Sequence, residues 1–559
     1  KLALAIGDSW GGLFDCAWFH FSGRIPESAT GLPVVLILDV NGEMLVVDSL
    51  GNPLRGLTNG SSVYDYSLGT PGKRILPVTS RAEAGQIIDV WADAGCNDLF
   101  GNLQNNGTVK EAFIAVCNEE VRGLYYDYEV LLDFLKVLPP NSPRYHQVLT
   151  ALNDATWRLA HGCTNVEAQA ARARLAPVLA RRGGDPMLNI SAIGHAHMDL
   201  GWLWPIRETK RKGARTFATA LENMERYPNY IFGASQPQLF QWMKEDYPEL
   251  YERIKQKISE GRIEPQGAMW VEADTNLSGA EALVRQVLLG KRFFQKEFGA
   301  EINYLWLPDV FGYSAALPQI LKKSGVDYFM TQKMSWNQVN IFPHHSFYWQ
   351  GIDGSAVLAH MLPEETYNSP AGPRAVMKIE DNYKDKGVSE HALMLFGIGD
   401  GGGGPGEEHL ERLERIQNLA GLSPVRQETA ACFFEQWAKD AERSDGTARS
   451  FGTRGFPAWV GELYLERHSG TLTTEAKNKW YNRRMEQALR ELEWTAIFAG
   501  GEYPSARLEA IWREVLLYQF HDILPGSSIK RVYDESLARY REMFEEVEEL
   551  TCRAEDRLA

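Results

Sequence analysis

The sequence predicts a multidomain α/β protein with an N-terminal β-sandwich-like domain, a (β/α) barrel-like domain built on a mostly parallel sheet, and a C-terminal helical bundle. Its 559 residues are about twice what a single hydrophobic core usually organises. Short apolar runs alternate with amphipathic helical segments between residues 187 and 435, which is typical of a parallel sheet. The segments before and after this region lack that alternation.

Residues 1–118 are predicted to form the β domain. The apolar runs Val34–Val40 and Met44–Val47 flank Asn41-Gly42, a pair that is typical of turns. Residues 119–186 are rich in Ala, Leu and Arg, so we expect a helical linker region there.

Residues 187–435 supply five predicted strands: Leu188–Ile193, Ile302–Leu307, Tyr328–Thr331, Val357–Met361 and Ala392–Phe396. One intervening helix is expected to begin at Ser278, with Glu281 as its capping-box partner. Residues 436–559 are predicted to form a helical bundle that contributes to the site, with Thr474–Ala499 as one long helix.

The composition excludes several classes of partner. Lys and Arg number 58 against 73 Asp and Glu, a net charge of -15, which disfavours nucleic acid and anionic membranes. No stretch approaches about 18 consecutive apolar residues, so no membrane span is expected. Six scattered cysteines without a CxxC pair predict a reducing compartment, and hence a cytoplasmic location.

Polar side chains follow the predicted strands, where ligands gather in parallel sheets. After the first strand, His195, His197 and Asp199 alternate, so they can face one point and bind a metal such as zinc; buried, surface and capping roles are the alternative. Asp309 follows the second strand between Pro308 and Gly312. It is either a rigidly held nucleophile or metal ligand, or a helix N-cap.

Two later segments carry further candidates. Asp400 opens a run of four glycines that lets the backbone approach a ligand, or that acts as a hinge. His521 and Asp522 follow a helical stretch and either reach into a site or cap a surface helix. Asp309 and Asp400 together can form the carboxylate pair that glycoside hydrolysis requires.

These segments, in this order, resemble the zinc-dependent α-mannosidases of glycoside hydrolase family 38. The resemblance is carried by HAHMDLGWLWP at 195–205, LWLPDVFGYSAALPQIL at 305–321, GIGDGGGGP at 397–405 and FHDILPGSS at 520–528. The His521–Gly526 segment looks like the cytosolic, vacuolar and bacterial branch. Ile398 and Ser469 depart from the pattern of that branch, which usually has Asn and Arg there.

The resemblance implies one Zn²⁺ per chain and a retaining double displacement on oligosaccharides with terminal α-mannose. Residues 187–435 are then the catalytic domain. The implied zinc ligands are His197, Asp199, Asp309 and His521; the nucleophile is Asp309, the acid and base is Asp400, and Trp202, Phe311 and Asp522 bind the sugar. His195 is then a structural residue. Relatives of this type continue into C-terminal β domains, so the resemblance implies the N-terminal and catalytic portions of a longer enzyme. The sequence is also compatible with a homo-oligomer.

Two other functions fit parts of the sequence. Metal-dependent amidohydrolases also begin with an HxH after the first barrel strand, but they need further metal ligands on later strands, for which His360 is the only well-placed histidine. A non-catalytic carbohydrate-binding protein fits the β domain and the many aromatic residues. Binding alone, however, does not need both Asp309 and Asp400.

Overall fold

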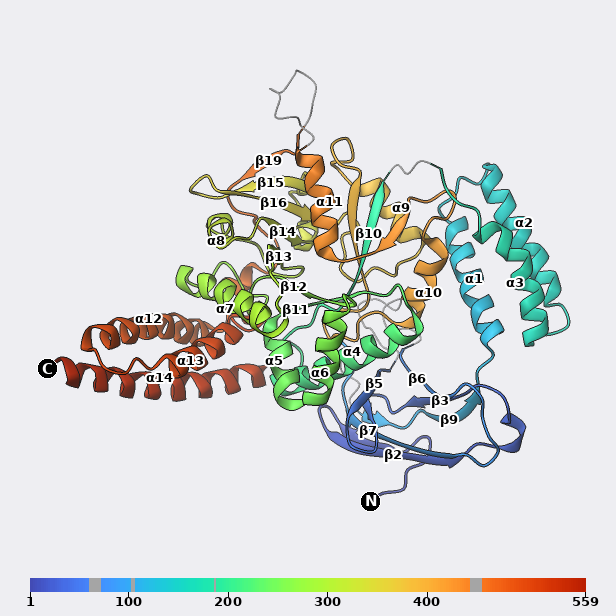
Figure 1. Cartoon of the computed structure of the whole chain (residues 1–559), viewed down its shortest axis with the longest axis horizontal. Coiled ribbons are helices and arrows are strands. Elements are labelled where there is room, and N and C mark those ends of the chain that lie inside the picture. The colour runs from blue at the N-terminus through green and yellow to red at the C-terminus, as the bar shows by residue number, and fades with distance from the viewer. Residues whose placement is uncertain (60–71, 102–105, 185–187, 443–454) are drawn as a thin grey trace.

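The computed structural model describes residues 1–59, 72–101, 106–184, 188–442 and 455–559. Figure 1 shows four regions in chain order: a β domain at the N-terminus, a group of helices, a central α/β region, and long helices that project away from it towards the C-terminus. No helix in these ranges is long and apolar enough to cross a bilayer. The predicted division between residues 435 and 436 falls inside a helix, α11, and the one between 186 and 187 lies outside the described residues.

The N-terminal region consists of antiparallel strands, as predicted. The larger sheet has the order β2-β7-β4-β5 and the smaller one β6-β3-β9, while β1 pairs with β8. Apolar side chains from both sheets, such as Leu36 and Met44, share one core, so the sheets pack face to face. The strands are β1 Ser9–Gly12, β2 Cys16–Arg24, β3 Val34–Asp39, β4 Glu43–Val47, β5 Pro53–Leu57, β6 Ile75–Thr79, β7 Ile87–Gly95, β8 Asn106–Thr108 and β9 Glu111–Val116.

Three helices follow: α1 Glu119–Leu135, α2 Pro143–Arg158 and α3 Asn165–Leu179. They pack on one another at one side of the molecule (Figure 1). Ser142 caps α2, because its side chain accepts a hydrogen bond from the backbone N–H of Tyr145.

The central region contains the five predicted strands. The elements are β10 Asn189–His195, α4 Ile206–Arg226, β11 Phe232–Ser235, α5 Pro237–Asp246, α6 Pro248–Ser259, β12 Ile263–Gln266, α7 Ala280–Phe298, β13 Tyr304–Trp306, α8 Leu317–Lys323, β14 Tyr328–Thr331, β15 Ser346–Gln350, β16 Ala356–Met361, α9 Pro373–Asn382, β17 His391–Phe396, α10 Glu407–Ile416, β18 Val425–Gln427, α11 Ala430–Glu442 and β19 Ala458–Val460.

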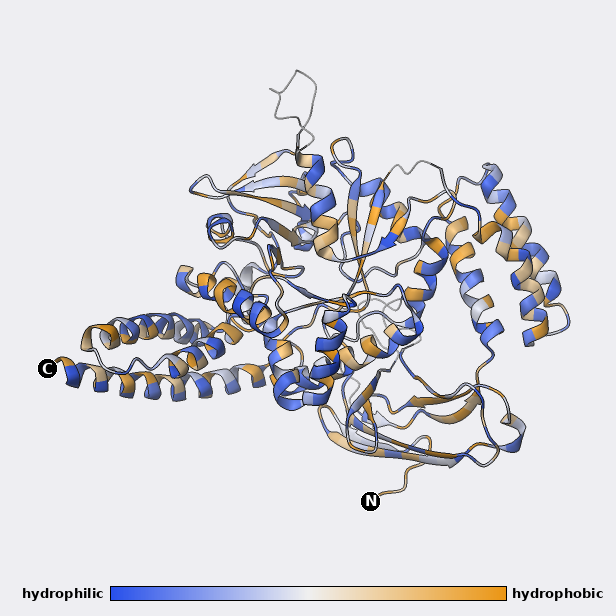
Figure 2. Ribbon diagram, viewed as in Figure 1, coloured by the Kyte–Doolittle hydropathy of each residue, from blue (hydrophilic) through white to orange (hydrophobic). Residues whose placement is uncertain are grey.

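These strands form two sheets. One has the order β12-β11-β10-β17, with β18 also on β10, and is parallel throughout; the other has the order β13-β14-β16-β15-β19 and is mixed. The pairing found among the described residues therefore supports a mostly parallel α/β region, but does not close the predicted barrel. Figure 2 shows hydrophobic residues interspersed with hydrophilic ones along the central strands.

The predicted capping box at Ser278 was wrong. Helix α7 begins at Ala280 after Gly279, and no side chain caps it. Glu281 instead pairs with Arg285 one turn later, at 2.9 Å. The backbone N–H of Gly279 is satisfied by the Glu486 carboxylate, at 2.9 Å, so a partner from the C-terminal region replaces the local cap.

The C-terminal region is helical, as predicted: α12 Ala476–Ala499, α13 Ser505–Tyr518 and α14 Lys530–Leu558. Helices α12 and α14 lie side by side over much of their length (Figure 1). Hydrophilic and hydrophobic residues alternate along these helices in Figure 2, as expected for amphipathic helices that bury one face. The end of α13 returns to the central region and brings His521 there.

Candidate active site and metal centre

The cleft that contains the predicted site residues lies at the carboxyl ends of three central strands. His197 and Asp199 follow β10, Asp309 follows β13 and Asp400 follows β17. The cleft measures about 430 Å³. It is lined by Phe100, Asp199, Trp202, Asp309, Phe311, Gln332, Lys333, Trp336, Glu365, Thr366, Tyr367, Asn368, Asp400, His468, Thr471, Asp522 and Ser527. His197 and His521 are fully buried beside it.

Strand pairing brings Asp199 and Asp400 together. Strands β10 and β17 are parallel neighbours, and Gly194 pairs with Phe396. Beyond the paired ends, the backbone N–H of Asp199 donates to the carbonyl of Asp400, at 2.8 Å. Gly399 permits this approach, because a Cβ there would lie 3.0 Å from the Cβ of His197.

Three buried side chains converge on one point next to the cleft. Asp199 Oδ1 lies 3.0 Å from His197 Nε2 and 3.5 Å from His521 Nε2. His197 Nε2 and Asp199 Oδ1 form an ion pair, but by hydrogen-bond geometry none of the three atoms has a partner among the described residues. Buried polar atoms are rarely left without partners, and two imidazole nitrogens with a carboxylate oxygen are common ligands of divalent metals. The arrangement therefore fits a metal ion.

Two further acids, Asp309 and Asp522, lie near this cluster. Asp309 Oδ2 lies 3.9 Å from His521 Nε2, and Asp522 Oδ2 lies 3.6 Å from it. Although burial opposes the shift, the contact with His197 lowers the pKa of Asp199 to about 2. Asp199 is thus a carboxylate across the ordinary pH range, and the pocket favours a positive charge.

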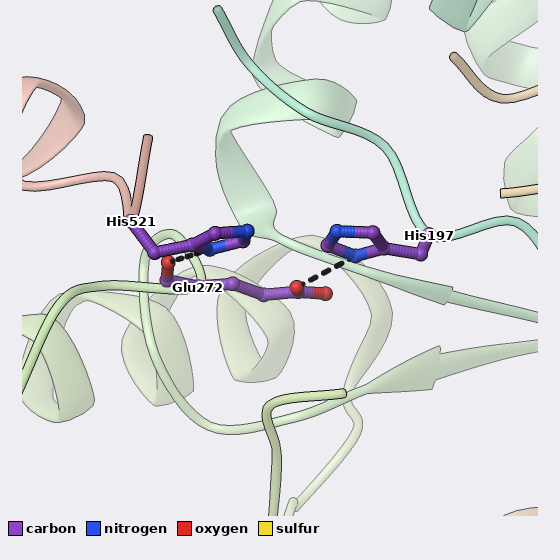
Figure 3. Close-up of side chains that lie close together, drawn as sticks. All are labelled: His197, Glu272 and His521. Atoms are coloured by element: carbon purple, nitrogen blue, oxygen red, sulfur yellow. Dashed lines mark hydrogen bonds and ion pairs between the residues drawn. The ribbon is translucent and has the colours of Figure 1, made fainter. Parts of the chain in front are cut away.

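Glu272 contacts both histidines and was missed by sequence analysis. Figure 3 shows its side chain directed at His197 and its backbone at His521. Glu272 Oε2 lies 2.8 Å from His197 Nδ1, and the Glu272 carbonyl accepts a hydrogen bond from His521 Nδ1 at 2.7 Å. Since both contacts occupy Nδ1, both Nε2 atoms remain for a ligand. No local sequence pattern marks Glu272, because it does not follow any of the predicted strands.

Lys333 is a second residue that sequence analysis missed. Its ammonium lies 2.7 Å from Asp309 Oδ1, and both side chains are almost completely buried. Asp309 does not cap a helix: α8 begins only at Leu317, after Ala316. The sequence did contain a signal that could have identified Lys333: it closely follows the correctly predicted strand β14, as Asp309 follows β13.

Asp400 has the environment of a carboxylic acid that keeps its proton. Burial, with the charges of Asp199 and Asp309, raises the pKa of Asp400 to about 7. The Tyr367 hydroxyl donates to Asp400 Oδ1 at 2.6 Å and fixes the side chain. Asp400 adopts a φ of 59°, which is uncommon for a non-glycine residue and often marks functional sites.

The remaining candidates lie as follows. Trp202 and Phe311 line the cleft, and Phe311 packs against the His521 ring with centroids 5.6 Å apart. Asp522 accepts a hydrogen bond from Ser527, while burial raises the pKa of Asp522 to about 8. His195 is buried beneath the cleft against Trp306, and burial lowers its pKa to about 3, so it stays neutral.

The two residues that depart from the family pattern, Ile398 and Ser469, do not line the cleft. Ile398 is buried and packs with Leu99 and Phe100 of the N-terminal region rather than entering the cleft. Ser469 is exposed, although its neighbours His468 and Thr471 line the cleft.

Comparison with known families agrees with this geometry. Residues 187–462 match the N-terminal domain of the glycosyl hydrolases family 38, and residues 466–558 match the alpha mannosidase middle domain. Residues 2–118 match an alpha-mannosidase jelly roll domain. The chain belongs to glycoside hydrolase family 38.

Several alpha-mannosidases are similar to this protein along almost the whole chain. Alpha-mannosidase 2C1 of Homo sapiens is 37% identical over 556 residues, which cover 96% of this chain and 51% of that protein. Alpha-mannosidase G of Dictyostelium discoideum is 35% identical, with coverage of 97% and 49%. The alpha-mannosidase of Saccharomyces cerevisiae is 34% identical, with coverage of 94% and 50%. The chain spans about half the length of these relatives.

Solved structures of the family share the fold. An alpha-mannosidase from Enterococcus faecalis superposes with a TM-score of 0.57 at 17% identity, covering 66% of this chain and 43% of that one. A second family 38 protein from Enterococcus faecalis gives a TM-score of 0.51 at 16% identity, covering 67% and 40%. The predicted membership of family 38 is thus confirmed.

Proposed function

We propose that the chain is the catalytic part of a zinc-dependent retaining glycoside hydrolase that removes terminal α-linked mannose from oligosaccharides. The observation that supports this most is one cleft that holds Asp309 and Asp400 beside the His197, Asp199 and His521 cluster. The names of the relatives agree with the substrate.

In this proposal one Zn²⁺ per chain is held by His197, Asp199, Asp309 and His521. The donor set of two imidazoles and two carboxylates suits zinc. When bound, the ion supplies Lewis acidity and positions for sugar hydroxyls. Glu272 orients both histidines towards it.

The remaining residues carry out two displacements. Asp400 holds a proton near neutral pH and donates it to the glycosidic oxygen as the bond from that oxygen to the anomeric carbon breaks. Asp309 forms an ester bond to the same carbon. Asp400, now a carboxylate, then takes a proton from water, whose oxygen attacks the carbon and returns the electron pair to Asp309.

The sugar is proposed to lie between aromatic and acidic side chains. Trp202 and Phe311 offer flat apolar faces on the cleft wall, which suit the C–H surface of a pyranose. Asp522 is buried at the same wall and offers hydrogen bonds to the hydroxyls.

We also propose that the chain is divided into residues 1–118, 119–186, 187–435 and 436–559. We propose a cytoplasmic location as well. All six cysteines are free, which agrees with a reducing compartment.

The amidohydrolase alternative is weaker. His360 is fully buried, with its Nδ1 3.0 Å from the Ser346 hydroxyl and its Nε2 accepting the Leu393 N–H at 3.4 Å. It does not line the cleft. The metal ligand which that alternative needs is therefore missing from this position.

One assay tests the proposal: hydrolysis of 4-nitrophenyl α-mannoside by the wild type, by chelator-treated protein and by Asp309→Ala, with the product anomer followed by NMR. We expect an α-anomer first, loss of activity with chelator, recovery with zinc, and an inactive variant. Chelator-insensitive hydrolysis would remove the role of the metal. Full activity of Asp309→Ala, or a β-anomer, would overturn the double displacement.

A further inference from the structure

Lys333 is a buried cation that the chemistry above leaves unused. Its side chain is only 3% exposed, and its Nζ lies 2.7 Å from Asp309 Oδ1. Among the described residues that line the cleft, it is the only Lys or Arg. Burying an ammonium group is costly unless it is paired, so its position requires an explanation.

Strand pairing places Lys333 beside Asp309. Strands β13 and β14 are parallel neighbours, with Trp306 paired to Met330 (Figure 1). Asp309 and Lys333 each lie three residues beyond these paired positions, so both side chains emerge at the same edge of the sheet. The backbone N–H of Lys333 donates to the Thr331 hydroxyl at 3.1 Å, which fixes the turn.

Aromatic rings hold the ammonium group in place. Its Nζ lies 4.1 Å from the ring centroid of Trp336 and 4.9 Å from that of Phe311. Such contacts stabilise a desolvated cation. They leave the ammonium pointing at one carboxylate oxygen of Asp309, while the other oxygen faces His521.

The charge on Asp309 changes in opposite directions during the two displacements. In the first, the carboxylate loses its charge as it becomes an ester of the sugar. In the second, water attacks, the ester bond breaks, and the electron pair returns to the carboxylate. A neighbouring cation stabilises the charged form, so it favours the second step relative to the first.

We propose that Lys333 is a positioning residue that stabilises the leaving carboxylate of Asp309 and thereby accelerates breakdown of the glycosyl-enzyme. This rests on the proposed function. It predicts that removing the charge slows the second displacement more than the first, so that the covalent intermediate accumulates. A residue that only supports the fold would lower both rates together or lower stability.

The test uses 2,4-dinitrophenyl α-mannoside, whose good leaving group makes the first step fast, on the full chain of the wild type, Lys333→Met and Lys333→Arg. For Lys333→Met we expect a burst of dinitrophenol stoichiometric with enzyme, a steady-state kcat lowered about tenfold or more, and a lowered KM. Rapid quench and intact-protein mass spectrometry should detect one mannosyl adduct. Lys333→Arg should recover most of kcat.

Two controls keep the outcomes separate. The double variant Lys333→Met with Asp309→Ala should give no adduct, and Lys333→Gln, which keeps a polar side chain, should show the burst if Lys333→Met folds poorly. If Lys333→Met and Lys333→Gln show neither burst nor adduct, and the relative rates of the two displacements stay as in the wild type, the role of Lys333 is overturned. No dinitrophenol release by the wild type would overturn the proposed function, and this inference with it.

Discussion

Glu272 Oε2 lies 2.8 Å from His197 Nδ1, and through this contact one acidic residue orients the first histidine of the cluster. The same residue orients the second, because its carbonyl accepts a hydrogen bond from His521 Nδ1. Glu272 is itself fixed: its Oε1 accepts from the Ser235 hydroxyl at 2.7 Å, and its backbone N–H donates to the Gln236 side chain at 3.1 Å. The geometry of both Nε2 atoms therefore depends on Glu272.

Glu272→Ala should weaken metal binding. Loss of such an outer partner typically lowers metal affinity about 10–100-fold, because the imidazole loses its orientation and basicity. The measurement is competition between the purified protein and a zinc chelator, without any substrate. The zinc affinity of Glu272→Gln should lie between those of the wild type and Glu272→Ala. Ser235→Ala is the matched control, since it removes a contact of Glu272 without touching a histidine. Equal affinities in all four proteins would contradict this role.

The fold was predictable from sequence where the strands are rich in apolar residues. Strand β14 was predicted to the residue, and β10, β13, β16 and β17 within one or two residues. Strands β11 and β12 were missed because their sequences, FGAS and IEPQ, contain few residues that favour strands. They form because they extend the parallel sheet from β10, which is a tertiary effect.

The site was predictable only in part for a similar reason. His197, Asp199, Asp309 and Asp400 follow strands, so chain order alone brings them to one edge, although their individual roles stay predictions. Glu272 follows no predicted strand, and Lys333, although it follows one, is marked as a site residue only by its contact with Asp309. A buried contact of this kind depends on strand register, which sequence does not supply.

The loss of activity caused by Asp400→Ala should be larger for a substrate with a poorer leaving group. A general acid contributes about 10²–10⁴-fold to a reaction whose leaving oxygen needs a proton, and little where it does not. We therefore expect a large loss on methylumbelliferyl α-mannoside and a much smaller one in the first turnover of the dinitrophenyl glycoside. Asp522→Ala, proposed to act on sugar hydroxyls, should affect both substrates alike. An equal loss on both by Asp400→Ala would argue against the acid role.

Gly401→Ala should disrupt the loop that carries Asp400. A Cβ at Gly401 would lie 1.2 Å from the carbonyl oxygen of Leu99, so either the loop or the N-terminal region must move. Such overpacking typically lowers the free energy of unfolding by about 1–3 kcal/mol, or by more where the new atom clashes with the backbone. We expect a lower melting temperature and a lower kcat. Gly387→Ala is the control, because a Cβ there meets nothing within 4 Å. Equal melting temperatures and rates for the two variants would refute the clash.

Lys73 connects the N-terminal region to the same glycine loop. Because of this buried lysine, the free energy of unfolding should vary with pH in the alkaline range. Its Nζ is buried and donates to the carbonyl of Gly404 at 3.1 Å. Burial lowers the pKa of Lys73 to about 8, whereas an unfolded lysine titrates near 10.4, on the order of two pH units higher. Between these values the unfolded chain binds more protons than the folded one, so the contribution of Lys73 to the free energy of unfolding rises with pH.

This pH dependence is measured against a variant that cannot titrate at residue 73. Urea unfolding of the wild type and Lys73→Met from pH 7 to 10.5 should give a difference that is flat up to about pH 8. Above that pH it should rise in favour of the wild type, by about 1.4 kcal/mol per pH unit at most. Lys477→Met, which removes an exposed lysine instead, is the matched control. A difference for Lys73→Met that stays constant or falls above pH 8 would mean that the buried lysine keeps its proton. The N-terminal region would then hold the Asp400 loop through an amine that stays charged, rather than through one that loses its charge above about pH 8.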